Sequence, residues 1–253
     1  MKITILGSGT SQGIPVIGCE CEVCRSNDTY DKRLRSSALI EIEGKKLLID
    51  AGPDFRYQML RAHVKDVRAI LLTHEHKDHT GGLDDVRAFN WIKGGYVDIY
   101  CDQRTCDAIH KDYAYAFMPV KYPGVPDMSM HVIDNHPFYV DDIKIIPLTV
   151  MHYKLPVTAF RLDNFAYITD ANFISEESKK KLKGVEYLVI NALRKEPHVS
   201  HFSLDQALEI IRELQVKRAY ITHIGHQMGL SAEVSAELPS NVQLAHDMLT
   251  FEI

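Results

Sequence analysis

The densest group of potential metal ligands lies in the sequence Thr-His-Glu-His-Lys-Asp-His, residues 73–79. It places His74, His76, Asp78 and His79 directly behind the aliphatic run 67–72. Imidazole nitrogens suit Zn²⁺ and similar cations, and a carboxylate offsets part of the charge of the ion. Four ligands so closely spaced do not easily surround one tetrahedral ion that keeps an open position. We therefore expect two ions to share this loop.

Two neighbouring elements must position these ligands. The run 67–72 is typical of a buried strand, because it is almost continuously aliphatic. Residues 81–89 are typical of a helix start. The ligands would then occupy a loop at the carboxyl end of a strand, where α/β proteins usually place their chemistry.

Three cysteines form a second unusual feature. Cys19, Cys21 and Cys24 follow the spacing Cys-x-Cys-x2-Cys, which lets three thiolates converge on one ion. A structural Zn²⁺ needs a fourth ligand. Cys101 and Cys106 are candidates for it, and so is a residue near the end of the chain.

The length and composition limit the kinds of protein that this chain can be. The chain has 253 residues, enough for one large α/β domain over residues 1–253, and its 45% apolar and 25% charged residues are ordinary for a globular protein. The net charge of −5 offers no attraction for nucleic acid. Because no run is long enough for a membrane span or a signal peptide, we expect a cytoplasmic protein without a membrane partner.

The pattern His-x-His-x-Asp-His, which residues 74–79 match without a gap, resembles the metallo-β-lactamase superfamily. The resemblance implies an αββα sandwich of two mixed β-sheets flanked by helices, with the active site at one edge. It also implies three later ligands at strand ends, in the order His, bridging Asp, His. The predicted strands 142–148, 165–170 and 218–223 are followed by or end in such residues, namely His152, Asp170 and His223.

The same resemblance assigns the ligands to two divalent ions, Mn²⁺ or Zn²⁺. His74, His76 and His152 would hold one ion, and Asp78, His79 and His223 the other, with Asp170 between them. Two ions and two carboxylates, with a bridging hydroxide, leave a charge of +1. This charge suits an anionic phosphate ester better than a neutral amide.

A narrower resemblance concerns the cysteines. The phosphodiesterases of phosphonate breakdown that hydrolyse phosphoribosyl cyclic phosphate pair such a cysteine motif with a His just beyond the last ligand. Here that residue is His226. The resemblance therefore implies a structural Zn²⁺ on Cys19, Cys21, Cys24 and His226. It also implies hydrolysis of a small or cyclic phosphodiester by a hydroxide held between two ions.

Two further residues take roles from the resemblance. Asp50 ends a predicted strand and would orient the ligand loop from behind. His201 precedes a helix whose start carries the capping box Ser203–Gln206. Related phosphodiesterases carry a His here that protonates the leaving oxygen, and His198 is the weaker candidate for this role.

Several alternatives stay open. A tRNA-processing nuclease shares most of the motifs but should carry a basic arm, which this sequence lacks. A thioesterase or a lactonase would not need His201, and a scaffold that binds metal without catalysis would not need the complete ligand set. The proline-broken aromatic segment 113–128 favours a packed loop or a homodimer contact over a lid on the substrate.

Overall fold

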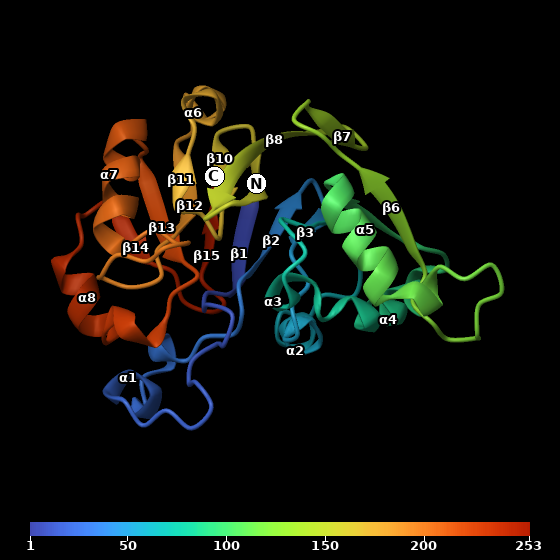
Figure 1. Cartoon of the computed structure of the whole chain (residues 1–253), viewed down its shortest axis with the longest axis horizontal. Helices are drawn as coiled ribbons and strands as arrows, with labels where there is room; N and C mark the ends of the chain where they lie inside the picture. Colours follow the sequence, from blue (N-terminus) through green and yellow to red (C-terminus); the bar gives the residue numbers. More distant parts are fainter. The chain divides into compact units, whose positions relative to one another are not determined.

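The computed structural model describes residues 1–253 (Figure 1). The chain forms two compact units, which are described separately. Unit 1 comprises Met1–Leu6, Ser37–Asp134 and Met248–Ile253, and unit 2 comprises Gly7–Ser36 and Asn135–Asp247. Each unit contains one β-sheet with its own helices. The predicted fold class, two mixed β-sheets flanked by helices, is confirmed, while the single domain over the whole chain stays a prediction.

The sheet of unit 1 has seven strands and mixed direction. Its order is β15 (Thr250–Glu252), β1 (Lys2–Gly7), β2 (Ser37–Ile42), β3 (Lys45–Ile49), β4 (Ala69–Leu71), β5 (Val97–Cys101) and β6 (Met128–Val132). Antiparallel pairs join β1 to β15 and β2 to β3, whereas β3 to β6 run parallel to one another. The parallel strands place the ends of β3 and β4 at the same edge of the sheet.

The helices of unit 1 share one hydrophobic core with this sheet. They are α2 (Phe55–Arg61), α3 (Lys77–Thr80), α4 (Arg87–Lys93) and α5 (Gln103–Asp112), together with the 3-10 turns η2 (Leu83–Val86) and η3 (Ala114–Ala116). Leu48, Ile70 and Ile99 of the sheet pack in the same buried cluster as Phe55 and Phe89 of the helices. Burial of such side chains contributes about 1.5–3 kcal/mol each.

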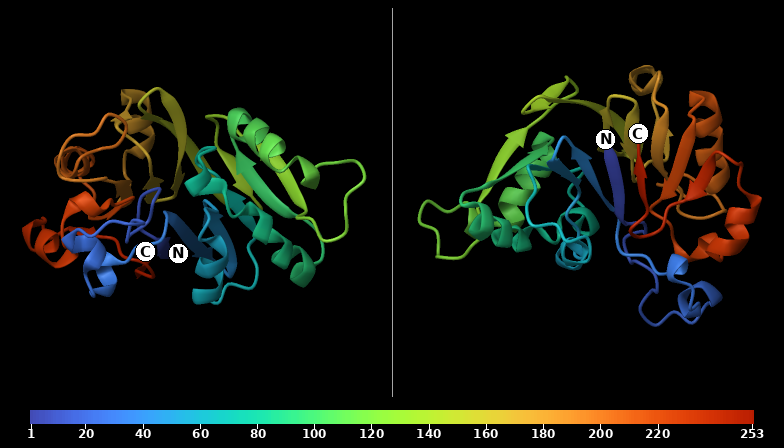
Figure 2. Two further views of the ribbon diagram at one scale, coloured as in Figure 1. Left: turned by 60° about the horizontal axis from the view of Figure 1, so that its bottom comes forward. Right: turned by 180° about the vertical axis from the view of Figure 1, so that it is seen from behind.

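The two ends of the chain meet in unit 1. Strand β1 pairs with β15, and Lys2 lies opposite Glu252. The amino group of Met1 donates a hydrogen bond of 2.8 Å to the carbonyl oxygen of Ile253. Figure 2 shows the two ends side by side in both views. The first and last residues therefore belong to one edge of one sheet.

The sheet of unit 2 has eight strands. Its order is β11 (Phe173–Ile174), β8 (Ile143–His152), β9 (Leu155–Leu162), β10 (Phe165–Ile168), β12 (Tyr187–Asn191), β13 (Arg218–Thr222) and β14 (Val242–Leu244), and β7 (Phe138–Val140) pairs with β8 alone. Strands β10, β12, β13 and β14 are parallel, so their carboxyl ends lie at one edge. Polar residues that follow these strands are therefore brought together.

The helical elements of unit 2 are α1 (Glu22–Arg25), η1 (Thr29–Asp31), α6 (Glu176–Leu182), α7 (Leu204–Leu214), η4 (His226–Met228) and α8 (Ser231–Glu237). The predicted capping box of α7 is confirmed: the Ser203 hydroxyl accepts from the Gln206 backbone, and the Gln206 side chain accepts from the Ser203 backbone. Ala207 and Ile211 of α7 pack in one core with Leu188 and Ile221 of the sheet. None of the helices combines the length and the apolar character needed to cross a membrane.

Two predictions of secondary structure were wrong. The segment 81–89, expected to start a helix, forms the 3-10 turn η2 and then the first residues of α4, and it is preceded by an unpredicted helical turn, α3, in which Asp78 and His79 lie. Strand β8 continues through His152, because its pairing with β9 extends to Leu155.

The aromatic segment 113–128 is packed at its start and exposed at its tip. The Tyr113 hydroxyl is buried and donates to the carbonyl oxygen of Thr80 at 2.8 Å, and Tyr115 hydrogen-bonds to Asp84. Val120 and Tyr122 are largely exposed. A packed loop therefore describes the first residues only, and the homodimer contact stays a prediction.

Candidate metal centres

The four predicted ligands of the His-x-His-x-Asp-His motif gather in unit 1. His74 and His79 are fully buried, and the His74 ring centroid lies 4.5 Å from that of His76 and 4.3 Å from that of His79. Oδ2 of Asp78 lies 3.1 Å from Nε2 of His79. The turn from β4 into α3 thus brings together three imidazoles and one carboxylate from six consecutive positions.

Asp50 orients two of these imidazoles, as predicted. Its Oδ2 accepts a hydrogen bond from His79 Nδ1 at 2.6 Å, and both of its oxygens accept from Thr73. Because the Thr73 hydroxyl donates to Asp50, it accepts from His74 Nδ1 at 2.9 Å. With Nδ1 protonated in both rings, Nε2 is the nitrogen that can bind a cation.

Burial governs the ionisation of Asp50. The side chain is fully buried, and this burial raises the pKa of its carboxyl, while His79 and the hydrogen bonds from Thr73 act in the opposite direction. Its backbone has a φ of 61°, the left-handed conformation that few residues other than glycine adopt readily. Such a conformation costs about 1–3 kcal/mol and persists only where the surroundings impose it.

Backbone contacts hold the ligand turn against Asp50. The amide of Ala51 donates to the carbonyl oxygen of His79, and the amide of Gly82 donates to that of Ala51, both at 2.8 Å. A Cβ on Gly82 would lie 2.1 Å from the carbonyl oxygen of Gly52. Only glycine therefore allows this close approach, which fixes the turn that carries the ligands.

The other three predicted ligands, and His201, lie in unit 2. His152 ends β8, Asp170 follows β10, and His223 follows β13. Oδ2 of Asp170 lies 3.2 Å from Nδ1 of His223. The potential ligand atoms of His152, Asp170 and His201 all lie within 4.8 Å of one another. His152 Nδ1 donates to the carbonyl oxygen of Ser200 at 2.8 Å, which again leaves Nε2 as the nitrogen that can bind a cation.

His201 has an environment that the sequence did not reveal. It is 8% exposed, its Nδ1 lies 3.7 Å from Oδ1 of Asp170, and its ring lies 4.6 Å from that of His152. Burial, with the charge of His223 as the next cause, lowers the pKa of His201 to about 3. A neutral imidazole in such a position can bind a cation as well as serve a reacting group. His198, the weaker candidate, is half-buried, and its ring lies 5.2 Å from that of His201.

Asn191 supports Asp170 and was missed in the sequence. Its side-chain oxygen accepts from the amide of Ala171 at 2.8 Å, and its nitrogen donates to the carbonyl oxygen of Ala171 at 2.9 Å. This pair of bonds fixes the residue after Asp170, whose own φ of 51° is left-handed. A signal existed, because Asn191 also ends a predominantly aliphatic run, Leu188–Ile190.

Ser36 and Thr10 contact His223 and were also missed. The Ser36 hydroxyl donates to the carbonyl oxygen of Gly9 at 2.9 Å and therefore accepts from His223 Nδ1 at 3.1 Å. Thr10 Oγ1 lies 3.1 Å from His223 Nε2. Together they set the direction of the imidazole, which protrudes from a backbone with a φ of 54°.

Replacement of Ser36 by alanine should weaken metal binding without unfolding the protein. Loss of a hydrogen bond that orients a ligand typically lowers metal affinity about 10- to 100-fold. The measurement is a titration of metal-free protein with Mn²⁺ or Zn²⁺, beside the Ser36→Thr variant, which keeps the hydroxyl. Equal metal affinity in the wild-type and Ser36→Ala proteins would show that Ser36 has no such role.

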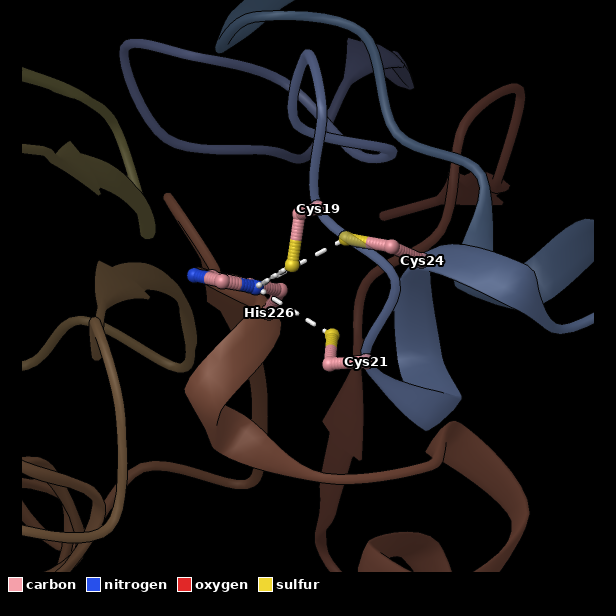
Figure 3. Close-up of side chains that lie close together, drawn as sticks. All are labelled: Cys19, Cys21, Cys24 and His226. Atoms are coloured by element: carbon pink, nitrogen blue, oxygen red, sulfur yellow. Dashed lines mark hydrogen bonds between the residues drawn. The ribbon is translucent and has the colours of Figure 1, made fainter.

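The cysteine motif and His226 form a second group in unit 2. His226 Nδ1 lies 3.3 Å from the sulfurs of Cys19 and Cys21 and 3.6 Å from that of Cys24. Figure 3 shows the three sulfurs directed at this one nitrogen, while the other ring nitrogen points away. The predicted four residues are therefore brought together. The other candidates, Cys101 and Cys106, are buried in the core of unit 1.

This arrangement fits a tetrahedral zinc ion. With Zn–S bonds of about 2.3 Å and a Zn–N bond of about 2.0–2.1 Å, the edges between sulfur and nitrogen would be about 3.5 Å long. The three observed distances lie close to this length. The backbone amide of Cys24, ahead of the side-chain hydrogen bonds of the cluster, lowers the pKa of Cys21 to about 6, which favours the thiolate that zinc requires, whereas burial raises the pKa of Cys24 to about 11.

The chain matches a family model and curated relatives. Residues 45–224 match the β-lactamase superfamily domain. An octanoyltransferase of Porphyromonas gingivalis is 39% identical over 252 residues, which are 98% of this chain and 51% of that protein. The chain thus spans about half the length of this curated relative.

Solved structures show a similar fold over the whole chain. A diphosphatase of the PhnP family has a TM-score of 0.93 and 39% identity, and the match covers 100% of this chain and 97% of that one. Zinc-bound PqqB of Methylobacterium extorquens has a TM-score of 0.78 and 19% identity, with 100% of both chains covered. The second likeness concerns the fold alone.

Proposed function

This chain belongs to the metallo-β-lactamase superfamily, within its PhnP family, and we propose that it hydrolyses small or cyclic phosphodiesters with two divalent metal ions. The observation that carries the proposal is the orientation of three imidazoles: Nδ1 of His74, His79 and His152 donates to an oxygen, so the lone pair that can bind a cation lies on Nε2 of each ring. Imidazole with carboxylate suits either Zn²⁺ or Mn²⁺.

We assign the ligands by their order along the chain. His74, His76 and His152 would bind one ion, Asp78, His79 and His223 the other, and Asp170 both. The donor set is chemically suited to this role, because it joins neutral imidazoles with two carboxylates. The Cys19, Cys21, Cys24 and His226 group would bind a structural Zn²⁺ and take no part in the reaction.

The two ions, when bound, would polarise the phosphate oxygens and supply an activated water molecule. The protein's own residues contribute orientation and proton transfer. Asp50 and Ser200 hold imidazoles in one tautomer. His201 would donate a proton to the leaving oxygen, and this role requires that the negative charge of the bound phosphate raise the pKa of its imidazole above the value of about 3 that burial imposes.

A diphosphate is the second candidate substrate, because the 39% identical PhnP-family relative is a diphosphatase. Both substrates offer an anionic, tetrahedral phosphorus to the same nucleophile, but the leaving group of a diphosphate is a phosphate instead of an alkoxide. A nuclease that processes tRNA has less support, since the net charge of −5 does not favour a polyanionic partner. Thioester or lactone hydrolysis would leave His201 without a role.

Metal-loaded protein should hydrolyse bis(p-nitrophenyl) phosphate, and removal of metal by a chelator should abolish the reaction. The assay compares this ester with a dinucleotide joined by a diphosphate, a thioester and a lactone, each after reconstitution with Mn²⁺ or with Zn²⁺. Faster cleavage of the diphosphate would favour the second candidate. Cleavage of the thioester or the lactone alone would contradict both phosphate proposals.

The role of His201 can be separated from metal binding in the same assay. A proton donor matters most when the leaving group is basic, as the alkoxide of an alkyl ester is. His201→Ala should therefore slow hydrolysis of an alkyl ester by about 100- to 10,000-fold and hydrolysis of a p-nitrophenyl ester by less. His198→Ala tests the weaker candidate for the same role and should slow neither ester. An equal loss for both esters, accompanied by loss of metal, would identify His201 as a ligand instead.

A further inference from the structure

Helix α5 forms two ion pairs with the turn that carries the metal ligands of unit 1. Nη2 of Arg104 lies 3.1 Å from Oε2 of Glu75, and the amino group of Lys77 pairs with the carboxylate of Asp112. Glu75 and Lys77 are the two neighbours of His76 in the sequence. Opposite ends of one helix, about 12 Å apart, therefore hold the residues on either side of this candidate ligand.

A third contact holds the end of the same turn. Tyr113 directly follows α5, and its buried hydroxyl donates to the carbonyl oxygen of Thr80 at 2.8 Å. The Thr80 hydroxyl in turn donates to the carbonyl oxygen of His76 at 3.1 Å. Burial raises the pKa of the Tyr113 phenol, so the hydroxyl stays protonated and remains a donor. The first residue of the aromatic segment 113–128 thus supports the ligand turn.

The position of α5 is set independently of these three contacts. The helix follows β5, which pairs with β4, the strand that leads into the ligand turn. The Asp102 side chain caps the helix by accepting from the amide of Thr105 at 2.8 Å, and Cys106 and Ile109 are buried in the core of unit 1. The helix is therefore a fixed support for the turn.

The charges of α5 that make these ion pairs are placed against the dipole of the helix. A helix favours acidic residues in its first turn and basic residues in its last turn. Arg104 lies in the first turn, and Asp112 is the last residue. A residue that conflicts with its local structure indicates a requirement elsewhere in the fold. The ion pairs with the ligand turn are such a requirement.

We propose that α5 positions His76 for metal binding. Its two ion pairs hold the backbone on either side of His76, so that the imidazole faces the ion that it would bind. The inference rests on the proposed function, for whose metal centre it names a positioning element. Arg104 and Asp112 act through the turn and contact neither the ion nor the substrate. Loss of one pair would leave the turn folded, because the contacts at the end of β3 remain, but it would loosen the direction of His76.

Removal of the Arg104 charge distinguishes positioning from electrostatics. Metal-free Arg104→Met protein, titrated with Mn²⁺ in a calorimeter, should bind one of the two proposed ions about 10-fold more weakly than wild type, the lower end of the loss expected for a residue that orients a ligand. Glu75→Gln should weaken binding similarly. A role through charge alone predicts the opposite for Arg104→Met, because loss of a positive charge near a cation should strengthen its binding.

Three further variants complete the test. Arg104→Lys keeps the charge and should keep the Mn²⁺ affinity. Lys111→Met removes a positive charge from the same helix and should also leave it unchanged. The double variant Glu75→Gln/Arg104→Met should bind no more weakly than either single variant, because both remove the same ion pair. Melting temperatures of the metal-free variants should stay close to that of wild type, since a partly exposed ion pair adds little to stability. Unchanged or tighter binding in Arg104→Met, or additive losses in the double variant, would overturn the inference.

Failure of the proposed function can be distinguished from failure of this inference, because the titration needs no turnover. If wild-type protein binds two Mn²⁺ ions but cleaves no phosphate ester, the proposed reaction fails and the titration still decides the inference. If it binds no ion beyond the zinc of the cysteine site, the proposed metal centre fails and the inference fails with it. Two bound ions with equal affinities in the wild-type and Arg104→Met proteins would overturn the inference alone.

Discussion

Replacement of Asp170 by asparagine should lower kcat/KM for a phosphodiester by about 1,000-fold or more. Asparagine keeps the shape of the side chain and tolerates the left-handed backbone at this position, but it removes the negative charge. Asp170 is 2% exposed and lies 3.2 Å from His223, so a positive ion bound there has its carboxylate at close range. An ion contributes several kcal/mol to the transition state, and about 4 kcal/mol corresponds to 1,000-fold in rate.

The measurement pairs steady-state kinetics with the metal content of the purified protein. Asp170→Asn should lose metal from the proposed dinuclear site and keep the zinc of the cysteine site. Asp163→Asn is the matched control, because Asp163 is an exposed aspartate of the same unit with a φ of 51°. Activity within tenfold of wild type in Asp170→Asn, at full metal content, would contradict a bridging role.

Cys21→Ala should remove one zinc ion per chain and lower stability by several kcal/mol. Binding of a structural Zn²⁺ contributes apparent free energies of about 10–16 kcal/mol in small zinc domains, and part of that would be lost here. The Cys21 side chain is exposed, so the truncation itself removes little packing. The ion would join the segment 19–24 to the turn that carries His226, and without it both segments should loosen.

Zinc content and thermal unfolding measure this effect together. Glu20→Ala alters the adjacent, exposed residue and should change neither quantity. A chelator strong enough to remove zinc from wild-type protein should lower its melting temperature toward that of Cys21→Ala. If the metal count of Cys21→Ala equals that of wild type, the assignment of this site is wrong.

The strands were predictable because they consist almost entirely of aliphatic residues. Runs such as 67–72 and 218–222 bury nearly every side chain, and such aliphatic stretches have few other uses in a globular protein. Their boundaries were less predictable. Helix α3 is a single turn without apolar periodicity, and β8 reaches His152 because of its partner strand rather than its own composition.

The clustering of the candidate ligands was predictable from the sequence, whereas most of the residues that support them were not. His74, His76, Asp78 and His79 stand close together in the sequence, so their shared purpose is visible in the spacing. Ser36 and Asn191 act through hydrogen bonds to residues that are distant in the sequence, 187 positions away for Ser36 and His223 and 20 for Asn191 and Ala171. One sequence without its contacts does not distinguish such residues from other polar residues at strand ends.

The pairing of β1 with β15 has a consequence for how this chain can be extended. Because Met1 and Ile253 are hydrogen-bonded neighbours, a second polypeptide fused to either end would leave from the same edge of the unit 1 sheet. A short peptide that joins the two ends would close the chain into a ring with little distortion, and the order of the segments could then be permuted. For this fold, amino-terminal and carboxyl-terminal fusion are nearly equivalent in geometry.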